Sequence, residues 1–238
     1  MRILLCFLSL FAATKALKTP RILSFGGNGM IGSETLHRLL QKKNYNITLV
    51  HRGNWFYDSK LRIQPFVTPI ICDRNKVPKC DNCTIHALKN SSSVLNEIIQ
   101  EAKIDDGFEA VLDFSAFEPK WVHDAMDILK DVKVGIYIYI SSDAVYEVSV
   151  PKTTKRLSVE TDAVRPKDPK LRTKLQKEDP YGNAKLAGEE VLRDQNKFPY
   201  LVFRYSKLFF FVFTFLYVSD YYQVNEGFRH SHLDYQKK

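Results

Sequence analysis

The sequence predicts an α/β fold, in which a doubly wound parallel sheet carries helices on both faces. Short apolar runs alternate along the chain with segments of helical periodicity, which is typical of βαβ units. A glycine-rich turn stands between the first apolar run and the first helical segment. A composition of 45% hydrophobic and 13% aromatic residues is enough for a sizeable core.

The individual elements follow from these patterns. Six apolar runs predict strands, at residues 21–25, 47–51, 67–72, 110–114, 134–141 and 200–204. Amphipathic segments predict helices, at residues 31–43, 94–103, 121–129 and 181–194. In the first of these helices Leu36, Leu39 and Leu40 recur at helical spacing. Strands that alternate with helices in this way form one parallel sheet, so a single domain is expected.

The composition excludes several classes of protein. The 238 residues include 35 Lys and Arg against 27 Asp and Glu, which gives a formal net charge of +8. The composition as a whole excludes a disordered, collagen-like or disulfide-dominated chain. Nine of the 35 Lys and Arg fall in residues 146–180, which we expect to form one long irregular connection. This basic connection either contacts an anionic partner or is a solvated loop, and we favour the solvated loop.

The first 16 residues have the anatomy of a signal peptide. A basic start, Met1-Arg2, precedes an apolar stretch at residues 3–13 and the segment Thr14-Lys15-Ala16. The stretch is too short to cross a membrane as a helix, and a buried N-terminal strand or helix is the alternative. We therefore expect entry into the secretory pathway, either to the ER lumen or outside the cell. If the segment is not cleaved, a cytoplasmic protein is expected.

Three glycosylation sequons agree with secretion. They begin at Asn46, Asn82 and Asn90. Asn46 lies at the start of a predicted strand, whereas Asn82 and Asn90 lie in a polar connection. The sequence therefore predicts a glycoprotein, with Asn82 and Asn90 as the better candidates.

Three cysteines remain after the predicted cleavage. Cys80 and Cys83 have the spacing of a redox motif or of half a zinc site. No second pair completes a metal site, so no metal is expected, and a thioredoxin-like dithiol lacks its fold context. In an oxidising compartment a loop disulfide of Cys72 with Cys80 or Cys83 is the better prediction.

The glycine-rich turn at residues 24–32 predicts a Rossmann-type nucleotide-binding fold. Gly26 allows the tight turn, Gly29 lets the backbone approach a pyrophosphate, and Gly32 lets the helix pack close to the strand. The phosphates are then expected on free N–H groups at the positive end of the helix. The predicted cofactor-binding residues of this turn are Gly26, Gly27, Asn28, Gly29, Met30, Ile31 and Gly32.

The end of the second strand predicts which dinucleotide is preferred. An NAD site places an acidic residue there for the ribose 2′-hydroxyl, but this chain has His51-Arg52-Gly53 and no carboxylate before Asp58. Arg52 can instead pair with a 2′-phosphate, so NADP is favoured and NAD remains the alternative. Asp73, just past the third strand, is expected to accept a hydrogen bond from the adenine amino group.

The candidate catalytic residues lie near the last two strands. Asp179-Pro180 is typical of a helix start, so Tyr181 and Lys185 share one face of the helix at i and i+4. A tyrosine titrates near 10, and a neighbouring ammonium favours the phenolate, so Lys185 is expected to lower the pKa of Tyr181. Ser142 leaves the fifth strand at its carboxyl end, where it can bind a substrate oxygen.

These motifs together resemble the extended short-chain dehydrogenase/reductase superfamily, in the NAD-dependent epimerase/dehydratase family. The glycine turn, Ser-Ser-x-x-Val-Tyr at 141–146 and Tyr-x-x-x-Lys at 181–185 match in order over about residues 20–204. Three further segments look like an atypical branch that includes the chloroplast stem-loop RNA-binding proteins: His51-Arg52-Gly53, Asp73-Arg74 and Asp113-Phe114-Ser115.

The resemblance implies a role for each candidate residue. Tyr181 would be the acid/base, Lys185 the phenolate stabiliser and nicotinamide-ribose ligand, and Ser142 the group that polarises the substrate oxygen. Sugar dehydratases carry an acidic pair where this chain has Asp143-Ala144, which counts against dehydration. The implied function is that of an NAD(P)-dependent oxidoreductase or epimerase acting on a sugar-like alcohol or nucleotide sugar.

The chain also departs from this family. The gap from Ser142 to Tyr181 is longer than usual, and residues 208–238 form a Phe-rich and then polar tail where a substrate-binding region is expected. We therefore expect an NAD(P)-binding domain at 17–207 in a C-terminally truncated member, with the substrate-binding region largely missing. The alternative is an inactive binding protein or truncated isoform that uses the basic connection for a partner. Secretion argues against RNA, no transmembrane span is expected, and a homodimer is a further possibility.

Overall fold

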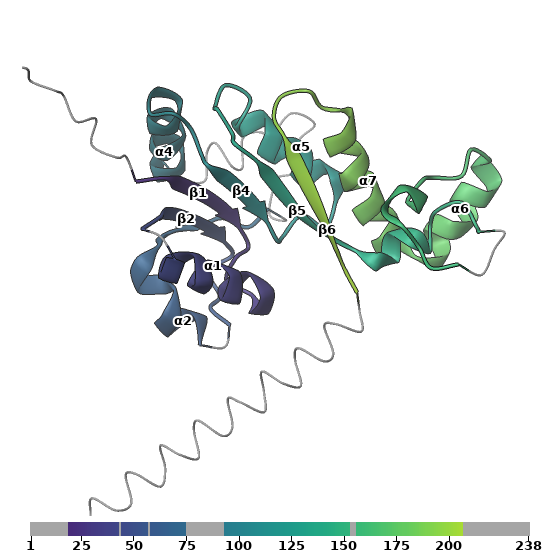
Figure 1. Ribbon diagram of the computed structural model, residues 1–238, viewed down its shortest axis with the longest axis horizontal. Coiled ribbons are helices and arrows are strands. Elements are labelled where there is room, and N and C mark those ends of the chain that lie inside the picture. The colour runs from purple at the N-terminus through teal and green to yellow at the C-terminus, as the bar shows by residue number, and fades with distance from the viewer. Residues whose placement is uncertain (1–18, 43, 57, 75–92, 153–155, 207–238) are drawn as a thin grey trace, which may run out of the picture.

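The structure contains one sheet of parallel strands. It is a computed structural model that describes residues 19–42, 44–56, 58–74, 93–152 and 156–206. The sheet order is β3-β2-β1-β4-β5-β6 (Figure 1), so the order reverses between β1 and β4 and leaves a crevice at their carboxyl ends. The strands are β1 (Arg21–Phe25), β2 (Asn46–His51), β3 (Thr68–Ile71), β4 (Ala110–Asp113), β5 (Tyr137–Ser142) and β6 (Tyr200–Tyr205).

Helices connect the strands in βαβ units. The α-helices are α1 (Met30–Lys42), α2 (Ser59–Arg62), α4 (Ser93–Ile104), α5 (Pro119–Ile128), α6 (Pro169–Glu178) and α7 (Pro180–Asp194). Short 3₁₀ segments are η1 (Gln64–Phe66), η2 (Asp143–Tyr146) and η3 (Glu160–Asp162). Each strand and helix expected from the sequence is present with its ends within three residues of the expected position. The predicted α/β fold with a parallel sheet is therefore confirmed.

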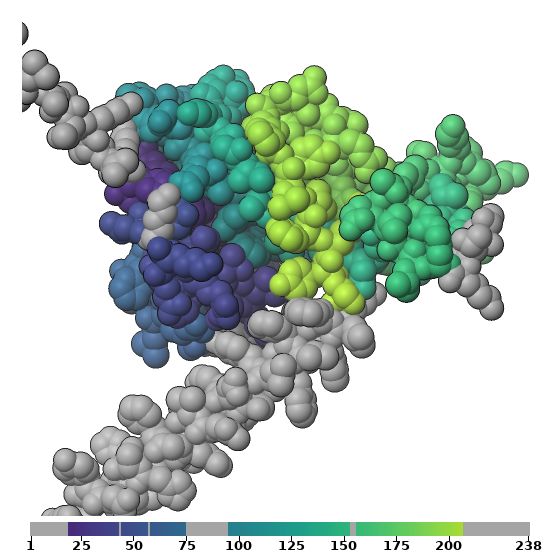
Figure 2. Space-filling view, viewed as in Figure 1, coloured from purple at the N-terminus to yellow at the C-terminus, as the bar shows by residue number. Residues whose placement is uncertain are grey.

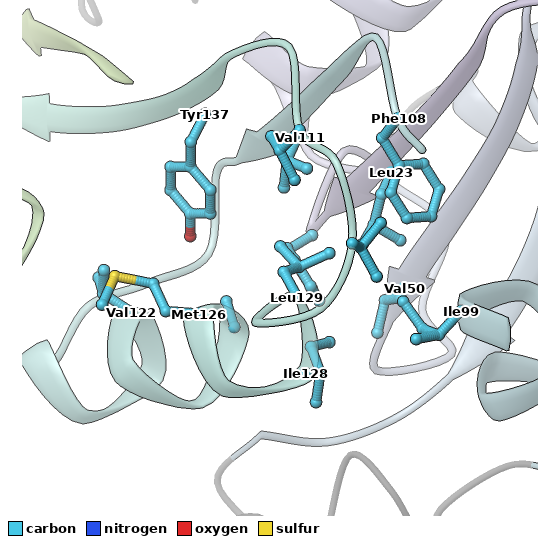
Figure 3. Close-up of a cluster of buried hydrophobic side chains, with 14 of the residues drawn as sticks. Leu23, Val50, Ile99, Phe108, Val111, Val122, Met126, Ile128, Leu129 and Tyr137 are labelled. Carbon is cyan, nitrogen blue, oxygen red and sulfur yellow. The ribbon is translucent and has the colours of Figure 1, made fainter. Parts of the chain in front are cut away.

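Two hydrophobic clusters cover opposite faces of the sheet. Side chains of a strand alternate in direction, and in β1 Leu23 belongs to the larger cluster while Ile22 belongs to the smaller one. The larger cluster, shown in Figure 3, joins the sheet to α4 and α5 through residues such as Ile99 and Val122. The smaller cluster joins it to α1 through Leu36. Each fully buried side chain of this size contributes about 1.5–3 kcal/mol.

The face of the smaller cluster is not covered as far as β6. Val202 packs against the larger cluster, but Leu201 and Phe203, which point the other way, are 42% and 49% exposed. None of the described helices lies over them. The sheet is therefore covered on both faces at β1, β2 and β4, and on one face at β6.

The connection at residues 146–180 differs from the expected irregular loop. It contains the ten-residue helix α6, and Figure 2 shows this part of the chain as a lobe that projects beyond the sheet. Asp168 caps the helix by accepting a hydrogen bond from the N–H of Lys170, and Pro169 occupies the first turn. No residue of α6 is fully buried, and its apolar stripe consists only of Leu171 and Leu175, which are partly buried and too few for a clear helical periodicity.

Several expectations concern residues outside the described ranges. They include the signal peptide at 1–16, the tail at 208–238, the sequons at Asn82 and Asn90, and the cysteines Cys80 and Cys83. Asn46 is exposed at the first position of β2, and Cys72 is buried just past β3. Within the described residues no helix is long and apolar enough to cross a membrane.

Candidate active site

The glycine turn between β1 and α1 includes backbone that no side chain covers. Gly26 has φ +75°, and a Cβ there would lie 2.5 Å from the Cβ of Ser115. A Cβ on Gly29 would meet nothing within 4 Å, so this stretch of backbone is open to a ligand. A Cβ on Gly32 would lie 2.6 Å from the Cα of Gly27, so the close approach at Gly32 is to the turn itself and not to the strand.

The turn borders a cleft of about 300 Å³ at the carboxyl ends of the strands. The N-terminus of α1 adjoins it, and bare backbone beside a helix N-terminus suits an anionic group such as a pyrophosphate. Of the predicted cofactor-binding residues, the cleft is lined by Gly26, Asn28, Gly29, Arg52 and Asp73. Those that do not line it are Gly27, Met30, Ile31, Gly32 and Lys185.

Asn28 joins the glycine turn to the loop after β2. Its side chain is buried, and Nδ2 donates a hydrogen bond to the carbonyl oxygen of Asn54. This contact holds the turn beside the loop that carries Arg52. Asn28 therefore shapes the cleft as well as lining it.

The end of β2 presents a cation to the cleft. Arg52 is exposed, whereas the preceding His51 is buried and its Nδ1 accepts a hydrogen bond of 3.2 Å from the N–H of Gly53. Burial lowers the pKa of His51, so its ring is neutral at pH 7. The carboxylate that lines the cleft is Asp73, which comes from the end of β3 and not of β2.

Ser142 ends β5 and begins η2. Its Oγ accepts a hydrogen bond of 3.2 Å from the N–H of Ala144 and lies 3.2 Å from Oδ1 of Asp143. The residue is buried, so its side chain is held in one place at the carboxyl end of the sheet.

Tyr181 and Lys185 are brought to Ser142 by α7. Asp179 caps this helix by accepting a hydrogen bond of 2.8 Å from the N–H of Gly182. Tyr181 is 41% exposed, whereas Lys185 is 2% exposed, and the Lys185 Nζ lies 5.9 Å from the centre of the Tyr181 ring. The Ser142 side chain is near enough to the Tyr181 hydroxyl to lower its pKa. The three residues expected from the sequence are therefore close together.

Carbonyl oxygens of two neighbouring segments hold the buried ammonium of Lys185. Nζ donates to Ala116 O at 2.8 Å and to Ile140 O at 2.9 Å. An ammonium has three N–H donors, so one remains beyond these two bonds. Burial lowers the pKa of Lys185 to about 8, although the carboxylates of Asp113 and Glu189 oppose this shift.

The pKa of Tyr181 differs from the sequence expectation. Partial burial raises it, and the charges of Asp143 and Asp179 raise it further, while the hydrogen bond with Ser142 lowers it. The expected lowering by Lys185 is absent: Lys185 is not among the groups that shift this pKa, and its Nζ, held by the two carbonyls, lies 5.9 Å from the centre of the Tyr181 ring. In the chain alone, Tyr181 is therefore a protonated phenol at pH 7.

Two groups of residues at this site escaped the sequence analysis. Phe117 follows β4 and is 47% exposed; its ring centre lies 6.3 Å from that of Tyr181 and 5.0 Å from the Lys185 Nζ. Phe117 therefore joins the cleft to the catalytic candidates. Its position just after a parallel strand is the sequence feature that could have indicated a place in the site. The second group is an ion pair, in which Arg204 of β6 binds Glu189 of α7 at 2.7 Å and anchors that helix.

The described residues contain no cluster of three or more His, Cys, Asp or Glu that could hold a metal ion. The chemistry available in the described part of the site is that of hydroxyls, an ammonium and an anion-binding turn. Such a set can move a proton at a substrate oxygen and hold a phosphorylated ligand.

The chain is similar to solved structures of enzymes at low sequence identity. The Bordetella bronchiseptica enzyme WbmG in complex with NAD is 14% identical with a TM-score of 0.54, and the match covers 80% of this chain and 54% of WbmG. The UDP-Glc/GlcNAc 4-epimerase of Campylobacter jejuni is 20% identical with a TM-score of 0.53, covering 78% and 53%. These similarities show the fold, and this chain spans about half the length of those proteins.

Comparison with families gives the assignment that the structural similarities alone do not. No match is found among curated protein sequences. The model of the NAD dependent epimerase/dehydratase family matches residues 22–209, which include the glycine turn, the cleft and the three catalytic candidates. The chain therefore belongs to the NAD-dependent epimerase/dehydratase family.

Proposed function

We propose that this protein is an NADP-dependent oxidoreductase or epimerase of the extended short-chain dehydrogenase type, acting on a sugar-like alcohol or nucleotide sugar. One observation carries the proposal: Ser142, Tyr181 and Lys185 lie together beside a cleft that a bare glycine turn borders. The family membership supports it, as does the similarity to WbmG, a structure described as a complex with NAD.

Each of the three residues then has a chemical role. The nicotinamide dinucleotide supplies the hydride donor or acceptor when bound. Tyr181, whose side chain is partly exposed, exchanges a proton with the substrate hydroxyl. Ser142 donates or accepts a hydrogen bond at the same substrate oxygen. Lys185 keeps one N–H donor for a ribose hydroxyl or for the phenolate that forms on Tyr181.

The preference for NADP rests on the end of β2. Arg52 is an exposed cation at the cleft, and β2 ends without a carboxylate that would bind a ribose 2′-hydroxyl and repel a 2′-phosphate. A guanidinium matches a phosphate with two parallel hydrogen bonds. Asp73 would accept a hydrogen bond from the adenine amino group, as its place after β3 suggests.

A second candidate function is that of a binding protein whose catalysis is lost. It is favoured by the projecting lobe around α6, in which no helix residue is buried and Lys167, Lys170 and Lys177 are exposed (Figure 2). Other cations of the lobe already have partners, since Arg165 binds Glu190 at 2.7 Å and Arg156 binds Asp162 at 2.6 Å. The available charge is therefore smaller than the sequence indicates, and we rank this candidate second.

Cofactor binding is tested with the full chain by titrating NADPH and NADH and following nucleotide fluorescence. We expect NADPH to bind more tightly by about tenfold or more, because a charge-assisted pair is worth about 1.5–3 kcal/mol. The Arg52→Ala variant should lose this preference while its NADH affinity stays the same. Equal or tighter binding of NADH by the wild type would contradict the NADP assignment.

Catalysis is tested by the Tyr181→Phe variant against a panel of nucleotide sugars. We expect turnover to fall by about 100-fold or more with unchanged NADPH affinity, because the general acid/base is removed and the cleft is kept. A variant that keeps its turnover would rule out the acid/base role. An inactive wild type that binds an anionic partner through the α6 lobe would favour the second candidate.

We also propose that residues 1–16 act as a signal peptide and direct the protein to the secretory pathway. Expression in secreting cells, followed by N-terminal sequencing and a glycosidase shift, tests this proposal. We expect a new N-terminus near residue 17 and a lower apparent mass after glycosidase treatment. An intact Met1 on an intracellular product would contradict it.

A further inference from the structure

Arg74 lies directly after Asp73, past the end of β3, and lines the cleft. Its side chain is 7% exposed, so its charge needs partners inside the protein. Nη1 lies 3.1 Å from both carboxylate oxygens of Asp113 and 3.1 Å from the Ser115 hydroxyl. Nη2 donates to the carbonyl oxygen of Trp121. One guanidinium therefore joins the ends of β3 and β4 to the first turn of α5.

The carboxylate that pairs with Arg74 has several further hydrogen-bond partners. Asp113 is entirely buried and also accepts hydrogen bonds from the Ser115 N–H at 3.0 Å, the Ala116 N–H at 2.9 Å and the Tyr137 hydroxyl at 2.7 Å. A buried ion pair is on average no more stabilising than apolar residues of similar size. Because stability alone does not account for this ion pair beside the cleft, we consider a role in the cleft itself.

The guanidinium of Arg74 is held in one place although one of its N–H groups makes no hydrogen bond. Its Nε is buried and has no hydrogen-bond partner among the described residues. The Cζ of Arg74 lies 4.8 Å from the centre of the Phe25 ring and 5.7 Å from that of Trp121. The guanidinium is thus held by two rings and by its Nη contacts with Asp113, Ser115 and Trp121, while Nε makes no hydrogen bond.

Ser115 is the contact through which Arg74 reaches the glycine turn. The backbone of Gly26 is so close to Ser115 that a Cβ on the glycine would lie 2.5 Å from the serine Cβ. The Phe114 N–H also donates to the carbonyl oxygen of Phe25 at 2.9 Å. The connection after β4 therefore lies directly against the turn, and the Arg74 hydrogen bond fixes the serine that touches it.

We propose that Arg74 is a positioning residue of the nucleotide cleft, which holds Ser115 against Gly26 and so sets the shape of the turn that receives the dinucleotide phosphates. This inference rests on the proposed function, because it assigns a role in dinucleotide binding. A lysine cannot replace Arg74, since one ammonium on a flexible stem does not reach Asp113, Ser115 and the Trp121 carbonyl at the same time.

The Arg74→Lys and Ser115→Ala variants of the full chain test the inference. NADPH affinity is measured by nucleotide fluorescence, and stability by thermal unfolding without nucleotide. Arg74→Lys should weaken NADPH binding by about tenfold, and Ser115→Ala by several-fold with little change in melting temperature. The double variant should bind no more weakly than Arg74→Lys alone, because both changes remove the same contact.

Arg21→Lys is the matched control. Arg21 also pairs with carboxylates, Asp105 at 2.8 Å and Glu101 at 3.4 Å, but it lies at the amino end of β1, away from the cleft. This variant should lower the melting temperature and leave NADPH affinity within about twofold of the wild type. A loss of NADPH affinity that merely follows stability would appear in the control as well and would overturn the inference.

The remaining outcomes separate the inference from the proposed function. If the wild type binds NADPH while Arg74→Lys and Ser115→Ala bind it equally well, the inference is wrong and the proposed function stands. If Arg74→Lys does not fold, Ser115→Ala, which keeps the ion pair, decides the question alone. If the wild type binds neither NADPH nor NADH, the proposed function fails and the inference fails with it.

Discussion

At the scale of single residues, two glycines of the same turn meet different surroundings. Gly26 has a positive φ and lies against Ser115, whereas the space beside Gly29 is open. Gly26 is therefore needed for folding of the turn, and Gly29 is needed only when a ligand occupies that space. Glycine is thus required for a structural reason at position 26 and for a functional reason at position 29.

The variants Gly26→Ala and Gly29→Ala test this difference. Gly26→Ala should lower the free energy of unfolding by about 1–3 kcal/mol, because the added Cβ is strained at this φ and overlaps Ser115. Gly29→Ala should leave stability nearly unchanged and weaken NADPH binding. Chemical denaturation and nucleotide fluorescence measure the two effects. Equal stability losses in both variants would contradict the assignment.

The buried Lys185 predicts a pH dependence of stability. Its pKa falls from 10.5 to about 8 on folding, so between these values the unfolded chain binds more protons and stability rises with pH. Below pH 8 the ammonium is charged in both states and its burial cost is present in full. Thermal unfolding between pH 8 and 9.5 should show a steeper rise for the wild type than for Lys185→Met. Parallel curves would show that Lys185 does not lose its proton in this window.

Sequence reasoning located Ser142, Tyr181 and Lys185 because their spacing and strand-end position are local properties. It noted Asp73-Arg74 as a family-like segment but assigned no role to Arg74, and it did not name Phe117. Their partners are distant along the chain, since Arg74 meets Asp113 and Phe117 meets Tyr181. Nor did it foresee the direction of the Tyr181 pKa shift, because that depends on the partial burial of the phenol and on the nearby charges of Asp143 and Asp179. The residues could be named from the sequence, but their electrostatics could not.

At the scale of elements, α6 and α7 share a start signal but differ in burial. Each begins with Asp-Pro, and in each the aspartate caps the helix. Helix α7 buries residues such as Leu186 and Leu192, whereas α6 buries none. The sequence predicted α7 from its periodicity and missed α6, although Asp168-Pro169 was a usable signal.

The two caps should therefore respond differently to removal. Asp168→Ala should unfold α6 locally and leave the main unfolding transition unchanged, because few contacts join this helix to the core. Asp179→Ala should lower the global free energy of unfolding by about 1 kcal/mol, because α7 is part of the core. Amide hydrogen exchange resolves the local effect, and denaturation the global one. A global loss in Asp168→Ala would show that α6 supports the fold.

At the scale of the whole molecule, the sheet has an uncovered region at β6. Leu201 and Phe203 are exposed on the face where α1 covers the other half of the sheet, and the chain spans about half the length of WbmG and of the Campylobacter jejuni epimerase. Exposed apolar side chains on an edge strand favour association with other chains. We therefore expect this face to favour self-association.

The variants Phe203→Lys and Val202→Lys test the sidedness of β6. Phe203→Lys should keep the melting temperature within a few degrees and reduce both self-association and binding of a hydrophobic dye, since the side chain is 49% exposed. Val202→Lys should unfold the protein, because Val202 packs against the larger cluster. Thermal unfolding and light scattering measure both variants. A folded Val202→Lys protein would contradict the described packing.

The sequence by itself determined the order of the elements, the parallel sheet, the glycine turn and the identity of the catalytic candidates. These follow from periodicity, caps and spacing, which act within a few residues of each other. Only the tertiary structure decided which residues line the cleft, that Arg74 joins three strand and helix ends, and that Lys185 is held by carbonyls. Those facts depend on burial and on contacts between distant segments, because the cost of an unpaired buried charge is set by everything that surrounds it.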